Sequence, residues 1–265
     1  MITRTITSVT MALVSVSILL FAGTVEATEV KVMISGGFSA AYQDLVPEYE
    51  RTTKDTVVTA RGGSMGNAPN SIPSRLQRGE PVDVFIMVGE ALDELLKQGK
   101  VVAGTRVDLA RSSIGMAVRA GAPKPDISSV DAFKRAVLDA KSIAYSTSAS
   151  GVYLSAELFP RLGIADRIRA KSKRVEGESV GAVLARGEAE MGLQQISELL
   201  AIPGIDYVGP LPLEIQKVTM FSAGIAVGAR NTDSARALIA FLASPAAASA
   251  IAKSGLEPVT PLEHK

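Results

Sequence analysis

The stretch that decides the fold is IPSRLQRGEPVDVFIMVGEALDELL, residues 72–96. Its first part predicts a helix that ends at Gly79, where glycine can adopt the left-handed conformation of a C-cap, and Pro81 prevents continuation. Residues 82–87 are mostly apolar and are bounded by turn signals, as in a strand covered on both faces. Leu92, Leu95 and Leu96 then recur at helical spacing. Helix, buried strand and helix in this order make half of a doubly wound α/β domain.

The rest of the chain continues the alternation of strands and helices. Further strands are expected at residues 29–34, 57–60, 113–118, 142–145, 191–195 and 218–227. Further helices are expected at residues 130–138, 164–170, 179–185, 197–201, 234–242 and 245–254. This order predicts two α/β lobes with a ligand between them, because clefts between domains are favoured sites for small molecules.

The deciding stretch also carries a family resemblance. RLQRGEPVDVFI, residues 75–86, resembles the Q-I-x-x-G-A-P-A-D-V-F-I segment of the periplasmic molybdate-binding proteins of ABC importers, and the likeness runs from Glu29 to Leu256. These are type II solute-binding proteins. The resemblance implies their two-lobed fold, with doubly wound sheets joined by two crossover strands. We expect residues 28–114 and 224–265 in lobe 1 and residues 115–223 in lobe 2.

The first residues predict a signal peptide rather than part of the fold. Arg4 precedes an apolar segment at residues 9–21, and Val25-Glu26-Ala27 resembles a cleavage site, so residues 1–27 are expected to be removed. A membrane anchor is the alternative, but the apolar run is shorter than the roughly 20 residues of a spanning helix. The mature chain is therefore expected to be a monomer in the periplasm.

Composition excludes several functions. The formal net charge is +1 without a Lys/Arg-rich run, which argues against nucleic acid as a partner. There is no cysteine, and the single histidine is His264 in the tail. Structural zinc and histidine-based triads are therefore not expected, and we predict neither a metal nor a cofactor.

Three loops rich in glycine and serine lie between an expected strand and an expected helix, at residues 35–38, 62–65 and 148–152. Helix N-termini present unpaired N–H groups and a partial positive charge, so such loops bind anions without lysine or arginine. The alternative for each loop is an ordinary turn with a serine cap. The three matching positions favour a small anionic ligand.

The contact positions of the molybdate-binding family fall at Gly37, Ser64, Ser150, Val180 and Gln195 in this sequence. One family serine is replaced by glycine, one alanine gains a hydroxyl, and one tyrosine becomes glutamine. The resemblance therefore implies a ligand other than molybdate, and we expect an organic anion. The predicted ligand-binding residues are Gly37, Phe38, Ser64, Met65, Ser150, Gly151, Val152, Val180, Gln195 and Arg75.

Charged and phenolic side chains are secondary candidates. Arg61 and Arg75 lie near the second loop and could pair with a carboxylate, unless they are ordinary surface charges. Glu178 is a candidate base, with a charge in the first turn of a helix as its alternative. Tyr153 is the other catalytic candidate, and Tyr145 is expected to line the second lobe.

Two functions fit these residues. The first is a periplasmic solute-binding protein that presents a small organic anion to an ABC permease. The second is a cofactor-free isomerase on the same scaffold, since fold does not fix function and periplasmic aconitate isomerases are known to resemble molybdate-binding proteins. That reaction shifts a C=C bond between trans- and cis-aconitate and needs one base and donors for three carboxylates.

Overall fold

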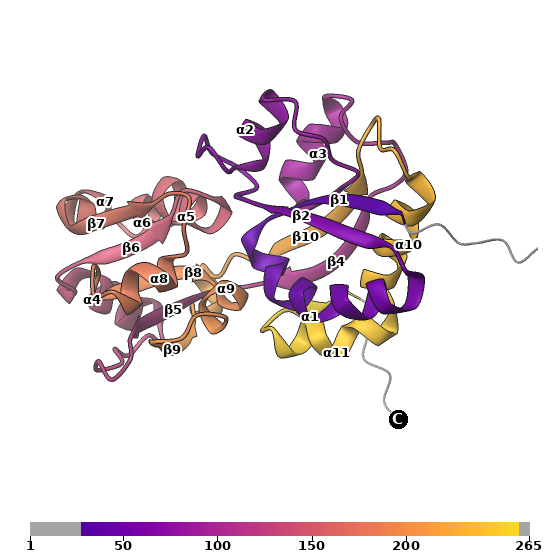
Figure 1. Ribbon diagram of the computed structural model, residues 1–265. Coiled ribbons are helices and arrows are strands. Elements are labelled where there is room, and N and C mark those ends of the chain that lie inside the picture. Colours follow the sequence, from indigo (N-terminus) through magenta and orange to yellow (C-terminus); the bar gives the residue numbers. More distant parts are fainter. Residues whose placement is uncertain (1–27, 260–265) are drawn as a thin grey trace, which may run out of the picture.

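Two mixed β-sheets divide the chain into two lobes, seen side by side in Figure 1. The computed structural model describes residues 28–259, so the predicted signal peptide and His264 lie outside the described residues. The two-lobed α/β class predicted from the sequence is confirmed by the two sheets and their covering helices.

The first sheet has six strands in the order β11-β4-β10-β3-β1-β2. Its strands are β1 (Glu29–Ile34), β2 (Thr56–Arg61), β3 (Val84–Val88), β4 (Val107–Ser112), β10 (Thr219–Ile225) and β11 (Glu257–Pro258). Its helices are α1 (Gly36–Thr53), α2 (Ile72–Gln77), α3 (Gly89–Lys97), α10 (Thr232–Leu242) and α11 (Pro245–Lys253). Strand β1 runs parallel to β2 and β3, whereas β10 runs antiparallel to β3 and β4.

The stretch at residues 72–96 adopts the structure that its sequence predicts. Helix α2 precedes Gly79, which has the left-handed φ of 72° expected of the glycine in this turn. Every residue of β3 is buried because helices cover both faces of the sheet. One core cluster joins β3 to α1, α10 and α11, and a second joins it to α2 and α3.

The second sheet has five strands in the order β7-β6-β8-β5-β9. Its strands are β5 (Ile114–Arg119), β6 (Ile143–Ser146), β7 (Ser172–Val175), β8 (Met191–Gln195) and β9 (Ile205–Pro210). Its α-helices are α4 (Val130–Asp139), α5 (Ala149–Tyr153), α6 (Phe159–Arg161), α7 (Ala165–Ile168), α8 (Val180–Ala185) and α9 (Ile196–Leu200), with a π-helical turn over Leu154–Leu158.

The chain passes between the sheets twice. The first passage falls between the last residue of β4, Ser112, and the first residue of β5, Ile114, which already pairs with Gln195 in the second sheet. The second passage occupies residues 211–218, and all of β10 lies in the first sheet. The expected lobe boundaries, at residues 114/115 and 223/224, therefore fall inside β5 and β10 rather than between strands.

Helix α1 buries one face in the core of the first lobe. Phe38, Tyr42, Leu45 and Tyr49 are spaced three or four residues apart, and all four are buried on one face of the helix. Lys54, with a left-handed φ of 69°, ends the helix.

No single helix among residues 28–259 is long and apolar enough to cross a membrane; α10 and α11 satisfy that test only as a pair bent by 63°.

Candidate functional site

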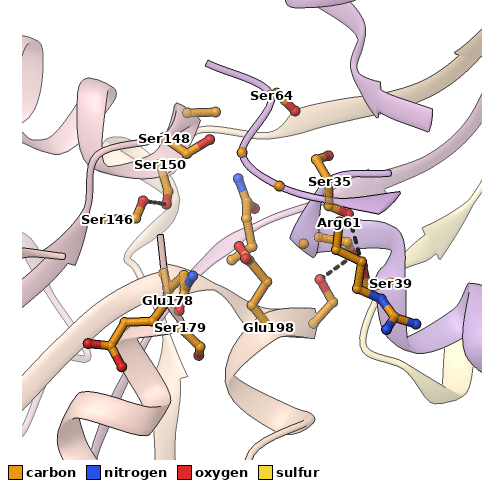
Figure 2. A pocket seen from close by; sticks show the side chains of 18 of the residues that line it. Ser35, Ser39, Arg61, Ser64, Ser146, Ser148, Ser150, Glu178, Ser179 and Glu198 are labelled. Carbon is orange, nitrogen blue, oxygen red and sulfur yellow. Dashed lines mark hydrogen bonds between the residues drawn. The ribbon is translucent and has the colours of Figure 1, made fainter. Parts of the chain in front are cut away.

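A cavity of about 360 Å³ lies between the lobes and is lined by residues of both (Figure 2). It is located where β1, β2, β6 and β8 end, since Ser35, Arg61, Ser146 and Gln195 all line it. Ligands of open α/β sheets bind beyond the carboxyl ends of the strands. The cavity is therefore the candidate ligand site.

Hydroxyl groups dominate the polar lining of the cleft, and the two lobes contribute them from opposite sides (Figure 2). The hydroxyl residues are Ser35, Ser39, Ser64, Ser146, Thr147, Ser148, Ser150, Ser179 and Ser197. Hydroxyls donate hydrogen bonds to anions without adding a net charge. This lining suits a negatively charged ligand.

Ser64 of the first lobe and Ser150 of the second both line the cavity. The Ser64 hydroxyl accepts a hydrogen bond of 3.0 Å from the Val88 N–H, which leaves its own proton available for a ligand. Ser150 Oγ lies 3.3 Å from Ser146 Oγ, so these two hydroxyls form a pair at the edge of the second lobe. The N-cap of α5 is Ser148, not Ser150. Ser150 therefore does not cap this helix.

Glu198, at the start of α9, is a carboxyl group in the middle of the cleft, and Figure 2 shows it between the two groups of serines. Burial raises the pKa of Glu198 to about 7, and a hydrogen bond with Gln194 opposes this shift. A carboxyl group with this pKa is divided between its acid and base forms at neutral pH. It can accept and return a proton, as general acid–base catalysis requires.

Two side chains each donate a hydrogen bond from one lobe to a backbone carbonyl of the other. Ser197 Oγ donates to the Gly37 carbonyl oxygen at 2.7 Å, and Asn70 Nδ2 donates to the Gly177 carbonyl oxygen at 3.2 Å. Both connect a residue of the first lobe to one of the second. The lobes are thus in contact at residues that line the cavity.

Gln195 fixes one end of its amide and leaves the other unpaired. Its Nε2 donates to Thr219 Oγ1 at 3.0 Å, while Oε1 is buried and has no hydrogen-bond partner within residues 28–259. Gln194 instead accepts from the Val180 N–H at 3.0 Å and so supports the start of α8. Gln195 is the glutamine that retains hydrogen-bonding capacity for a ligand.

Several predicted site residues line the cleft: Gly37, Ser64, Met65, Ser150, Gln195, Arg61 and Glu178. Glu178 forms an ion pair of 2.9 Å with Arg186, and its carboxylate points away from the middle of the cleft in Figure 2. The charged end of Arg61 also points outward in this view. These two groups therefore lie at the rim of the cleft.

The other predicted residues are placed elsewhere. Phe38 and Val180 are fully buried in the cores of the two lobes. A Cβ on Gly151 would lie 1.6 Å from the Ser146 carbonyl oxygen, so this glycine is required for packing between α5 and β6. Val152, 40% exposed, is not part of the lining.

Arg75, Tyr145 and Tyr153 are also engaged away from the ligand cavity. Arg75 pairs with Glu80 at 2.6 Å. The Tyr153 hydroxyl donates to the Ile215 carbonyl oxygen at 2.9 Å, and Tyr145 packs edge to face against Phe159. None of the three residues is among those that line the cavity, and their part in ligand binding stays a prediction.

Sequence reasoning missed Glu198 and Phe221 as lining residues, and it placed Ser35 in a candidate loop without naming it as a ligand-binding residue. Glu198 carried a positional signal, since it follows β8 by three residues and lies in the first turn of the next helix. Phe221 lies in β10, which is distant in sequence from the loops of the site, and no local pattern indicates its contact with Gly37. A Cβ on Gly37 would lie 2.1 Å from the tip of the Phe221 ring.

No group of three histidine, cysteine, aspartate or glutamate residues within residues 28–259 is arranged to hold a metal ion. The chemistry that the cleft offers comes from hydroxyls, amides, helix N–H groups and Glu198. A two-lobed molecule with an anion-adapted cleft between its lobes belongs to the class of solute-binding proteins.

The comparisons identify the family. Residues 30–257 match the family described as bacterial extracellular solute-binding protein, and the chain belongs to this family. A curated relative from Pseudomonas sp, named aconitate isomerase, is 50% identical over 232 residues that cover 88% of each chain. The molybdate-binding protein ModA of Azotobacter vinelandii is 28% identical and covers 89% of this chain and 92% of its own. The chain thus falls in the molybdate-binding-protein-like group that includes an aconitate isomerase.

Solved structures show the same fold. The periplasmic molybdate-binding protein of Azotobacter vinelandii matches with a TM-score of 0.70 at 20% identity, over 88% of this chain and 99% of that one. The sulfate-binding protein SubI of Mycobacterium tuberculosis H37Rv also has a TM-score of 0.70, at 19% identity and 88% coverage of each chain.

Proposed function

We propose that this protein is a cofactor-free isomerase that moves the C=C bond of a tricarboxylic acid, converting trans-aconitate to cis-aconitate in the cleft. Glu198 carries the proposal. It is a proton-exchanging group in the middle of an anion-adapted cavity, with a pKa of about 7. The 50% identity to the Pseudomonas protein named aconitate isomerase supports the choice of substrate.

The reaction is an allylic proton shift. The Glu198 carboxylate removes a proton from the methylene carbon of trans-aconitate, a new C=C bond forms to the central carbon, and the electron pair of the old double bond moves to the former vinylic carbon. That carbon then takes the proton from Glu198. No oxidant, reductant or net proton is required, so one residue poised near neutral pH is sufficient.

The remaining lining is suited to the substrate. Carboxylates need hydrogen-bond donors, which the serines of both lobes present. The unpaired Oε1 of Gln195 is an acceptor, so it can meet the proton of a protonated carboxyl group. The carbon skeleton needs apolar contacts, and Met65, Val88 and Phe221 line the same cleft. An inorganic oxyanion has oxygen on every face and would leave hydrogen bonds unmade against these side chains.

A second candidate is a receptor that binds a small organic anion and delivers it to an ABC permease. The observation that favours it is the pair of interlobe hydrogen bonds, because closure of two lobes around a solute is the motion of periplasmic binding proteins. In this case the cleft binds the ligand without changing it. Both candidates are expected to act in the periplasm after removal of the signal peptide.

Proton NMR of trans-aconitate incubated with the protein separates the candidates. We expect the vinyl signal of trans-aconitate to be replaced by that of cis-aconitate with wild-type protein and to remain with Glu198→Gln. Binding of trans-aconitate by wild-type protein without turnover would instead establish the receptor. Equal turnover by Glu198→Gln would remove Glu198 from the reaction.

A further inference from the structure

Gln194 is a polar side chain buried beside an apolar cluster. It is the penultimate residue of β8, on the face of that strand that packs against α8, since a Cβ on Gly192, two residues earlier, would lie 2.6 Å from Val180. The core cluster around α8 includes Val180 and Val183. Gln194 is only 3% exposed. Burying an amide is costly unless its polar atoms are hydrogen-bonded, so its presence here calls for an explanation.

One end of the Gln194 amide is fixed by the backbone. Its Oε1 accepts a hydrogen bond of 3.0 Å from the N–H of Val180, the first residue of α8. Because a backbone N–H can only donate, the amide oxygen must face it and the NH2 group must face another partner. Helix α8 also has a cap of its own, since Ser179 Oγ accepts from the Gly181 N–H at 3.1 Å. The Gln194 amide is therefore an addition to that cap.

The other end of the amide contacts the carboxyl group in the middle of the cleft. Gln194 is hydrogen-bonded to the Glu198 side chain, and both residues line the cavity. Nε2 is the end of the amide that donates, so a Glu198 oxygen is the acceptor. A hydrogen bond of this kind favours the ionised carboxylate, the form that removes a proton.

Gln194 acts against the effect of burial on Glu198. Burial raises the pKa of Glu198 to about 7, and the hydrogen bond from Gln194 opposes the rise; these are the two causes of the shift. The other charged residues that line the cavity are Arg61 and Glu178 at its rim, and Glu178 is paired with Arg186. Gln194 is therefore the side chain that keeps the carboxyl group able to ionise near neutral pH.

The elements packed against α9 present few titratable groups to Glu198. Helix α8 and strand β8 consist of uncharged residues. The residues of α1 that line the cavity are also uncharged: Gly36, Gly37, Ser39, Ala40 and Gln43.

The titratable groups of β5 and β9 lie elsewhere or stay neutral. Arg119 of β5 and Asp206 of β9 are at the far end of the sheet from Ile114, which pairs with Gln195 at the cleft. Tyr207 of β9 packs near α9, and burial raises its pKa, so it stays neutral where Glu198 titrates.

We propose that Gln194 is a positioning residue for Glu198. Its amide bridges the Val180 N–H and one oxygen of the Glu198 carboxyl group, which holds the carboxyl group in one orientation and leaves its other oxygen for the ligand. The inference deepens the proposed function and rests on it only where turnover is concerned. The contact between the two side chains can be tested without a substrate.

The titration of Glu198 can be followed by ¹³C NMR of protein labelled at the glutamate carboxyl carbon, and the resonance that is absent from Glu198→Gln assigns it. Wild-type protein is expected to titrate with a midpoint of about pH 7. Gln194→Met has a side chain of similar length but no donor, so the midpoint should rise by about one to two pH units. The midpoint of kcat/KM for trans-aconitate should rise with it.

Gln216→Met is the matched control. The Gln216 amide also joins backbone groups, since it accepts from the Ile114 N–H at 2.8 Å and donates to the Ile114 carbonyl oxygen at 2.9 Å, but it lies outside the lining of the cavity. Both variants should melt at a lower temperature than wild-type protein, and only Gln194→Met should shift the Glu198 titration. A lower melting temperature with an unchanged Glu198 midpoint in Gln194→Met would make Gln194 a structural residue and overturn the proposal.

Gln194→Glu decides the matter if Gln194→Met does not fold. Its carboxylate keeps an oxygen for the Val180 N–H, but it lacks the donor and adds a second carboxyl group beside Glu198. Two adjacent carboxyl groups resist ionising together, so the Glu198 midpoint should rise above that of wild-type protein. An unchanged midpoint would mean that the two side chains are not in contact, and the proposal would fall.

The outcomes for positioning and function are separable. A Glu198 midpoint that rises in Gln194→Met, in a protein that does not convert trans-aconitate, would support the positioning role and reject the proposed function. Conversion that is lost in Glu198→Gln but has the same pH midpoint in wild-type protein and in Gln194→Met would support the function and overturn the positioning role.

Discussion

The carboxyl group of Glu198, in the second lobe, lies against the backbone of Gly36, in the first, so closely that a Cβ on Gly36 would be 2.1 Å from Glu198 Oε1. The atom in the way is the end of a flexible side chain rather than backbone. Gly36→Ala is therefore expected to displace the Glu198 carboxyl group and to reduce turnover by about tenfold or more without unfolding the protein. Alanine is also a better helix former than glycine. Turnover and melting temperature of the variant, measured together, check this; lost turnover with a lower melting temperature would point to a folding defect instead.

The raised pKa of Glu198 makes stability depend on pH. Its pKa is 4.5 as an ordinary carboxyl group and about 7 in the folded protein, so the folded state binds the proton more tightly. Its contribution to stability is present in full below about pH 4.5 and is lost as pH rises to about 7. Glutamine does not ionise, so Glu198→Gln should remove the loss of stability that occurs as pH rises. The variant should be more stable than the wild-type protein by about 1–3 kcal/mol at pH 8 and differ little from it at pH 4.5. Denaturant titrations of both proteins at the two pH values test this, and an equal difference at both would contradict it.

Turnover should depend on the same group. Because the reaction needs the Glu198 carboxylate, kcat/KM for trans-aconitate should rise with pH and level off above a midpoint of about 7. The pH–rate profile of the free enzyme measures this midpoint directly. A profile that is flat from about pH 5 to 8 would mean that another group exchanges the proton.

Ser150 is expected to contact the ligand from the second lobe. Its hydroxyl lies in the cleft 3.3 Å from that of Ser146, and the N-cap of α5 is Ser148. Ser150→Ala should therefore weaken ligand binding by roughly tenfold to a hundredfold and leave the melting temperature unchanged. Calorimetric titration with trans-aconitate in a Glu198→Gln background measures affinity without turnover. An unchanged affinity would remove Ser150 from the binding site.

Phe221 should leave no space for a serine at position 37, where the molybdate-binding family has a serine and this protein has Gly37. The Phe221 ring would lie 2.1 Å from a Cβ on residue 37, so Gly37→Ser should destabilise the fold by about 1–3 kcal/mol. Phe221→Leu in the same chain should restore part of that stability, since it frees the space. Chemical denaturation of the single and double variants measures both effects.

Molybdate should bind wild-type protein weakly or not at all, and submicromolar binding by calorimetry would overturn this reading.

The fold was predictable because its signals are local. Gly79 predicts the end of α2 because a helix often ends at a glycine with a left-handed φ, and Gly79 has that φ. The apolar run before Gly89 predicts a buried strand, and every residue of β3 is buried. Strand β9 is not among the strands expected from the sequence, because Pro203 and Pro212 flank it and Pro210 is its last residue. It forms because it is the edge strand of the second sheet, where proline is tolerated.

The site was less predictable because it depends on how the lobes meet. Phe38 follows the glycine pair, but α1 already begins at Gly36, so its ring turns into the core. Arg75 forms an ion pair with Glu80, which lies in the turn after α2. The positions of these two residues in the sequence do not distinguish this ion pair from a contact with a ligand. Burial raises the pKa of Glu198, and its carboxyl group lies against Gly36 of the other lobe. The sequence around Glu198 does not indicate which residues of the other lobe will lie against it.

Ser197 and Asn70 hold the lobes together by hydrogen bonds to the backbone carbonyls of Gly37 and Gly177, and all four residues line the cavity. Separating the lobes breaks both bonds, and each neutral hydrogen bond contributes only about 1 kcal/mol net, so the barrier they add is modest. Loss of either donating side chain should therefore let the lobes separate more readily, which changes the fraction of molecules in the conformation that binds a ligand and with it the apparent affinity.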